Sequence, residues 1–189
     1  LKTLRDSLGP EKELSFAAGG FTKFLEEAVD WPEVVKYVAR ITLMTYDLVN
    51  GNSTVTGHHT PLYSTPEQVE STDHCVSYLL AKGIDPAKLV IGAAFYGRSF
   101  VQVKGDKNGL YQPGQFKSFI PYRTMDNRIS EEKGYRFYFD EVAMAPSWYN
   151  PKLEELVTFE NKQSVALKTR YAIDKGLGGL MFWELTLDK

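Results

Sequence analysis

Apolar side chains follow two different spacings along the chain, and these spacings divide it into predicted strands and helices. Four short runs are apolar at nearly every position and predict buried strands at Glu13–Ala18, Arg40–Leu48, Lys88–Arg98 and Gly178–Leu185. Strands that are apolar on both faces are typical of a parallel sheet covered by helices. The pattern therefore predicts the α/β class.

Between these runs, apolar residues recur every three or four positions, as in amphipathic helices. This spacing predicts the end of a helix before Gly9, a short helix capped by Asp30, a helix that begins near Thr65 and a helix over Asn161–Lys175. Strands and helices thus alternate through most of the chain, as expected of a parallel sheet.

One long stretch departs from this alternation. About 60 residues separate the third predicted strand from the last helix, whereas a loop between a strand and its helix usually has about 2–6. The run Tyr135–Phe139 predicts a strand inside this stretch. We therefore predict a small α+β insertion over residues 99–160, preceded by strands and helices over 1–98 and followed by the last helix and strand over 161–189.

Composition excludes several classes of function. The net charge of −2 and the lack of a Lys/Arg-rich run argue against a nucleic-acid partner. The sequence has no stretch of about 18 apolar residues, so no membrane-spanning helix is predicted. The single cysteine, Cys75, excludes an intrachain disulfide. His58, His59 and His74 have no metal-binding spacing, so we expect no metal or cofactor, and His58 and His59 are expected to be solvated in a polar loop.

Candidate chemistry gathers where the predicted strands end. The residues placed there are Met44, Tyr46, Asp47, Tyr96, Arg98, Trp183 and Glu184. In sheets of this kind, the carboxyl ends of the strands form the binding site. Hydroxyls, charges and a flat indole suit a sugar, which has both an apolar face and polar hydroxyls. On the residues alone, a Tyr-Asp pair at a strand end is more often structural, and a single tryptophan is more often part of the core.

Several segments together resemble glycoside hydrolase family 18, the chitinases. The matching segments are Met44–Leu48 (MTYDL), Ile91–Phe100 (IGAAFYGRSF), Tyr138–Glu141 (YFDE), Ser164–Lys168 (SVALK) and Gly178–Glu184 (GGLMFWE). They occur in the family's order through nearly the whole chain. The resemblance implies a (β/α)₈ TIM barrel, of which this chain would hold about strands five to eight, with an α+β insertion after strand seven. Residues 1–9 would end the fourth helix.

The resemblance also implies a reaction. Family 18 enzymes hydrolyse β-1,4 bonds between N-acetylglucosamine units with retention, and the attacking group is the substrate's own acetamido oxygen. Carried over by position, Tyr46 would hydrogen-bond the acetamido carbonyl and Asp47 would hold polar groups of the −1 and +1 sugars. Met44 would form part of the pocket floor. Tyr96 and Arg98 would make polar contacts with the −1 sugar, and Trp183 would stack beneath that sugar. The resemblance gives Glu184 no role.

The family's catalytic signature, D-x-x-D-x-D-x-E, does not occur in this chain. None of Glu11, Glu13, Glu26 and Glu27 follows that pattern, so we expect the catalytic glutamate upstream of Leu1. The chain alone is therefore expected to be inactive. A chitin-binding lectin without the glutamate, and an endo-β-N-acetylglucosaminidase acting on N-glycans, remain alternatives. An unrelated interaction module is a more distant one.

The same interpretation implies partners and a location. The expected ligands are chitin or N-acetylglucosamine oligosaccharides. A half barrel would leave strand edges exposed, which favours self-association. Because chitin is an insoluble polymer outside cells, the protein is expected to be extracellular or at the cell surface, although no signal peptide is recognised in residues 1–9.

Overall fold

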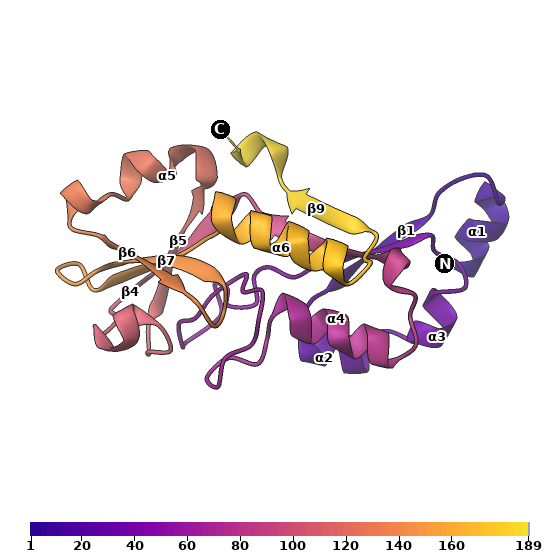
Figure 1. Ribbon diagram of the computed structural model, residues 1–189, viewed down its shortest axis with the longest axis horizontal. Helices are drawn as coiled ribbons and strands as arrows, with labels where there is room; N and C mark the ends of the chain where they lie inside the picture. Colours follow the sequence, from indigo (N-terminus) through magenta and orange to yellow (C-terminus); the bar gives the residue numbers. More distant parts are fainter. Residues whose placement is uncertain (189) are drawn as a thin grey trace.

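The computed structural model describes residues 1–188 and contains two sheets with helices around them (Figure 1). The helices are α1 (Lys2–Leu8), α2 (Thr22–Glu27), α3 (Trp31–Val34), α4 (Thr72–Ala81), α5 (Tyr122–Arg128) and α6 (Lys162–Asp174), with short 3₁₀ turns at Pro86–Lys88, Asp106–Gly109, Glu131–Lys133 and Leu185–Leu187. The strands are β1 (Ser15–Gly19), β2 (Arg40–Met44), β3 (Leu89–Ala94), β4 (Tyr96–Val101), β5 (Gln115–Pro121), β6 (Arg136–Asp140), β7 (Ala145–Asn150), β8 (Glu155–Thr158) and β9 (Gly179–Trp183).

The first sheet is parallel and confirms the predicted α/β class. Its strand order is β1-β2-β3-β9, and every neighbouring pair runs in the same direction. Each of its strands overlaps one of the four predicted runs. The central strand β3 is buried at all six positions, as its continuous apolar sequence predicts.

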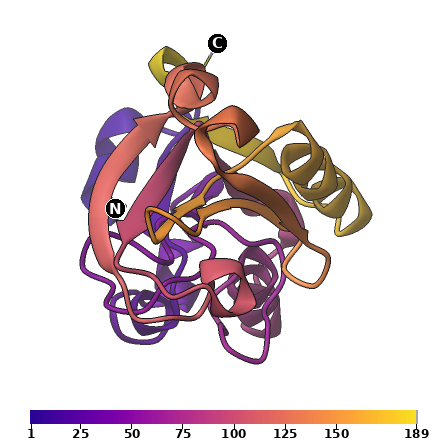
Figure 2. The same cartoon turned by 90° about the vertical axis from the view of Figure 1, so that its left-hand side faces the viewer.

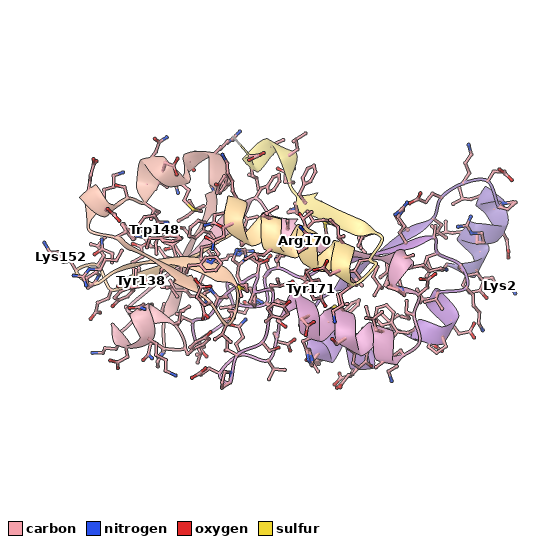
Figure 3. All side chains as sticks on the ribbon, viewed as in Figure 1. Lys2, Tyr138, Trp148, Lys152, Arg170 and Tyr171 are labelled. Carbon is pink, nitrogen blue, oxygen red and sulfur yellow. The ribbon has the colours of Figure 1, made fainter. Side chains whose placement is uncertain are left out.

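Helices cover one face of this sheet and form the main core with it. Leu43 and Ile91 from the strands pack with Val76 and Leu79 from α4, and Tyr171 from α6 completes the contact. The Tyr171 hydroxyl also donates a hydrogen bond to Asp73 (2.7 Å), which joins α6 to α4 (Figure 3).

The opposite face of the parallel sheet is more open. Ala17 of β1 is exposed, Met44 and Met181 are half-buried, and Trp183 is exposed. In the described residues, β1 and β9 each pair on one side only, so both edges of the sheet are free.

The second sheet is antiparallel, with the order β5-β4-β8-β7-β6. It lies beyond the carboxyl ends of the parallel strands (Figure 1), and Figure 2 views the molecule from its side. Its strands come between β3 and α6, where the α+β insertion was expected. The exact division into residues 1–98, 99–160 and 161–189 stays a prediction.

The single strand predicted over Lys88–Arg98 is wrong, because it is two strands in two sheets. At Phe95 the chain passes from β3 to β4: its N–H donates to the Trp183 carbonyl (2.8 Å), and its carbonyl accepts from the Tyr122 N–H (3.0 Å). This passage carries the chain from the parallel sheet directly into the antiparallel sheet.

One predicted helix begins later than expected. Helix α4 starts at Thr72, where the Ser71 hydroxyl accepts a hydrogen bond from the His74 N–H (3.0 Å). The residues near Thr65 form a turn in which the Gln68 N–H donates to the Thr65 hydroxyl (3.1 Å). The same side-chain chemistry serves a cap and a turn, so the pattern at Thr65 was misassigned. Among residues 1–188, no helix is long and apolar enough to cross a bilayer.

Candidate functional site

The chain segments that leave β2 and β3 bring two tyrosines together. Tyr46 follows β2 and Tyr96 begins β4, and their rings meet edge to face with centroids 6.2 Å apart. Both side chains are buried, and Met44 and Met181 pack against them. Gly92 makes room for the Tyr46 ring, since a Cβ at this position would lie 2.8 Å from it. A small residue in β3 thus allows the tyrosine to pack against the sheet.

Asp47 and Arg98 form the charged part of the site. Arg98 Nε lies 2.8 Å from Asp47 Oδ1, and Arg98 Nη2 lies 2.8 Å from Asp47 Oδ2. Such a two-pronged contact fixes both groups in orientation as well as in position. The guanidinium also lies against aromatic rings, 5.3 Å from the Tyr96 centroid and 5.9 Å from that of Phe119. Asp47 has a positive φ of 58°, an uncommon conformation that turns the chain after β2.

The surroundings keep the acid ionised and the tyrosines neutral. Burial alone raises the pKa of Asp47, but the facing His59 imidazole and the Arg98 guanidinium outweigh burial and hold the pKa well below its usual range. Burial, with the nearby Asp47 carboxylate, raises the pKa of Tyr46 to about 12. The same two causes raise the pKa of Tyr96. The site therefore presents a carboxylate beside hydroxyls that retain their protons.

The expectation that His58 and His59 are solvated is wrong. Their exposed fractions are 1% and 0%. The insertion supplies their cover: Asp140 of β6 lies 3.2 Å from His58 Nε2, and the Thr158 hydroxyl of β8 accepts a hydrogen bond from the His59 N–H (3.0 Å). The His59 ring lies 5.3 Å from the Tyr96 ring, and its Nδ1 is 3.8 Å from Asp47 Oδ1. His59 therefore belongs to the site.

A buried ion pair lies beneath the site. Lys168 of α6 and Glu160, which follows β8, form an ion pair with almost no exposure of either side chain. Glu160 accepts further hydrogen bonds from the Ala94 N–H (3.0 Å) and the Thr60 hydroxyl (3.1 Å). The pair therefore ties α6 to the end of β3 and to the loop after β2. Sequence reasoning missed it, because charged residues on a helix or in the loop before it normally face water.

Trp183 and Glu184 lie at the end of β9, and Trp183 is the neighbour of Ala94, which packs with the two tyrosines. Trp183 is 56% exposed, which excludes a core role in the described structure. The Glu184 carboxylate accepts a hydrogen bond from the Thr186 hydroxyl. Both residues share the carboxyl edge of the sheet with the other candidates. No group of three or more potential metal ligands occurs within residues 1–188.

Comparison with known proteins identifies the family. The sequence profile of the glycosyl hydrolases family 18 matches residues 1–188. The chain belongs to this family. Among curated family 18 relatives, a probable endochitinase of Orgyia pseudotsugata multicapsid polyhedrosis virus is 31% identical over the whole chain, which covers 37% of the viral protein. The chain thus spans less than half the length of this relative.

Solved structures of the family confirm that the parallel sheet is part of a TIM barrel. A family 18 N-acetylglucosaminidase from Paenibacillus barengoltzii matches with a TM-score of 0.88 and 30% identity, over 100% of this chain and 56% of that one. A group IV chitinase from Ostrinia furnacalis matches with a TM-score of 0.90 and 27% identity, over 99% of this chain and 55% of that one. The same chitinase has been solved in complex with allosamidin, with a TM-score of 0.89.

Proposed function

We propose that the complete protein is a chitinase that cleaves β-1,4 bonds between N-acetylglucosamine units with retention, assisted by the substrate's acetamido group. The observation that carries the proposal is the arrangement of Tyr46, Asp47, Tyr96 and Arg98 at the carboxyl edge of a family 18 barrel sheet. Neutral hydroxyls beside a fixed carboxylate suit an amide, which needs a donor for its oxygen and an acceptor for its N–H.

Tyr46 would act on the acetamido group, and Asp47 would hold the sugars on either side of the bond that is cleaved. The Tyr46 hydroxyl keeps its proton, since its pKa is raised to about 12, and it donates a hydrogen bond to the acetamido oxygen. That bond aligns the oxygen with the anomeric carbon and stabilises the charge that develops as the ring closes. Asp47 accepts hydrogen bonds from polar groups of the −1 and +1 sugars.

The other candidates would shape the pocket. Tyr96 and Arg98 contact hydroxyls and the amide at the −1 sugar, and Met44 forms part of the floor. The exposed indole of Trp183 offers a flat apolar face beneath the −1 sugar. Glu184 receives no role.

The acid that protonates the leaving oxygen would come from another part of the protein. We infer that a glutamate at the end of a D-x-x-D-x-D-x-E run lies upstream of Leu1. The 189-residue chain alone should then release no product from chito-oligosaccharides, and measurable turnover by the purified chain would refute this inference.

The relatives support the choice of substrate and the location. The viral relative is named as a probable endochitinase, and a similar chitinase has been solved with allosamidin. We propose that chitin or its oligosaccharides are the ligands of this protein too. Because such a polymer lies outside cells, we propose that the protein works there or at the cell surface.

The central experiment compares the complete protein with its Tyr46→Phe variant. Loss of the hydroxyl should lower kcat by about 100-fold or more, because one donor to developing charge is worth that much. Tyr37→Phe, which removes a hydroxyl at the opposite end of β2, is the matched control and should leave kcat unchanged. An unchanged rate in Tyr46→Phe would contradict the assigned role.

Two alternatives give different results with the same protein. Binding of chito-oligosaccharides without hydrolysis would identify a lectin. Release of N-glycans in place of chitin fragments would identify an endo-β-N-acetylglucosaminidase. If no N-acetylglucosamine oligomer binds, the protein is an interaction module of another kind.

A further inference from the structure

His59 is a buried ionisable group that the proposed reaction does not use. Its ring has no exposure, and neither Nδ1 nor Nε2 has a hydrogen-bond partner in the described structure. A buried polar atom without a partner destabilises the fold, because it gives up its hydrogen bonds to water and gains none in return. An apolar side chain would avoid this cost, so the position of this imidazole calls for a physical reason.

The groups around the ring point to that reason. Asp47, from the loop after β2, and Tyr96 and Arg98, from β4, lie on the side of the candidate site. Glu160, which already pairs with Lys168 of α6, also acts electrostatically on the ring and opposes the lowering of its pKa. Two nitrogen atoms therefore lie near Asp47 Oδ1: Arg98 Nε at 2.8 Å and His59 Nδ1 at 3.8 Å.

The distance between His59 and Asp47 is short enough to close. Nδ1 is 3.8 Å from Oδ1, so a shift of about 1 Å brings the two atoms into hydrogen-bond range. The other end of the loop is fixed, because the His59 N–H donates to Thr158 and the His59 carbonyl accepts from the Leu48 N–H (3.0 Å). With the His59 backbone held in this way, closing the gap requires the Asp47 carboxylate to give up part of its two-pronged contact with Arg98.

We propose that His59 is a positioning residue for Asp47, and that it sets the acid limit of the proposed saccharide site. As a neutral imidazole, it offers an N–H toward the carboxylate and keeps Asp47 oriented beside Arg98. Once protonated, it forms an ion pair with Asp47 and draws the carboxylate away from Arg98 and from the sugar. This inference rests on the proposed function for its ligand, but the contact between His59 and Asp47 does not.

Protonation of His59 is confined to acid conditions. Burial lowers its pKa, and the carboxylates of Asp47 and Glu160 only partly oppose this. The affinity of the site should therefore stay constant near neutral pH and fall where His59 gains a proton.

Two substitutions separate positioning from titration. His59→Asn keeps an N–H donor but cannot gain a proton, so it should retain kcat/KM at neutral pH and shift the acid limb of its pH profile to lower pH. His59→Phe keeps a ring but has no donor, so it should lose roughly 10- to 100-fold in kcat/KM, the range expected for a misplaced binding group. If His59 only fills space, the order of kcat/KM is reversed: His59→Phe, which keeps a ring, retains more activity than His59→Asn.

His58→Asn is the matched control. His58 is the neighbouring residue, is equally buried and also contacts a carboxylate, but its partner is Asp140 of the insertion. Its replacement should leave the acid limb of the profile where it is. If His58→Asn and His59→Asn move the limb equally, the effect comes from the loop as a whole and the proposal is overturned.

The test uses the complete protein and has a readout that needs no catalysis. Calorimetric binding of the tetramer of N-acetylglucosamine across pH replaces the rate profile if the protein binds without hydrolysis. The NMR titration of His59 is followed in parallel, with and without Asp47→Asn. Loss of the facing carboxylate should lower the pKa of His59 further. An unchanged pKa overturns the proposal even if chitin proves to be the wrong ligand.

Discussion

At the residue scale, Asp140 of β6 links the insertion to the loop after β2 through its contact with His58. Its carboxylate contacts His58 and accepts hydrogen bonds from the N–H groups of Val142 and Ala143 (2.9 Å each). The contact with His58 is the main cause that lowers the pKa of Asp140 from 3.8 to about 2. The two backbone hydrogen bonds lower this pKa further, whereas burial of the carboxylate opposes the change. Because the folded protein holds this proton more weakly than the unfolded chain, Asp140 stabilises the fold above pH 3.8.

This stability should be lost in acid. As pH falls from 3.8 towards 2, the unfolded chain takes up the proton first, and about 2 kcal/mol of unfolding free energy disappears. Asp140→Asn should lower the free energy of unfolding at neutral pH and flatten its decline below pH 4. Urea denaturation at several pH values measures both effects.

The control for this prediction is Asp6→Asn, which removes a carboxylate from the exposed helix α1. It should leave the shape of the pH dependence unchanged. A wild-type slope in Asp140→Asn would show that the contact with His58 contributes nothing to folding.

At the element scale, the attachment of α6 decides whether the site is held together. The ion pair of Lys168 and Glu160 is buried between α6 and the end of β3. A buried charge that loses its partner is strongly unfavourable, although replacement of both partners by neutral groups is often tolerated.

Lys168→Met should therefore lower the free energy of unfolding by roughly 3–5 kcal/mol. The double variant Lys168→Met/Glu160→Gln should recover part of that loss, because no isolated charge then remains. Lys162→Met, at the exposed start of the same helix, is the control and should change little. Thermal and urea denaturation test all three, and a single variant as stable as the double would show that the pair is not electrostatically coupled.

The same elements show how far the sequence predicts the structure. The strands were predictable because burial on both faces requires an apolar residue at nearly every position, as in β3. The start of α4 was not predictable, because the hydroxyls of Thr65 and Ser71 can both accept a hydrogen bond from a backbone N–H. Only tertiary contacts select which of the two begins the helix. His59 was missed for a related reason: whether a polar loop is buried depends on a distant segment, here β8 and its Thr158 hydroxyl.

The candidate site was predictable only in part. Tyr46 and Asp47 follow β2, and Tyr96 and Arg98 lie in β4, which continues directly from β3; the four come together because β2 and β3 end on one edge. Their partners Glu160 and Lys168 could not be found by that argument, because they belong to the connection after β8 and to a helix. The exposure of Trp183 follows from its place at the end of the edge strand β9.

At the scale of the whole molecule, the parallel sheet is open on both sides. Strands β1 and β9 each have one unpaired edge in residues 1–188, and apolar side chains are exposed beside β9, including Phe182, Trp183 and the 70% exposed Leu185. In a closed barrel no strand has a free edge. The structural relatives match this chain over only about half of their own length, so further strands would close the sheet in the complete protein.

The 189-residue chain on its own should therefore self-associate. Unpaired parallel edges and exposed apolar side chains favour pairing with a second copy, and the effect should grow with protein concentration. Light scattering coupled to size-exclusion chromatography measures the molar mass, and hydrogen exchange reports whether the β1 and β9 amides are slowed in the associated form. Phe182→Lys, which adds charge beside the β9 edge, should shift the equilibrium towards monomer. A single monomeric species at all concentrations, with rapid exchange at both edges, would mean that the open sheet is stable without a partner.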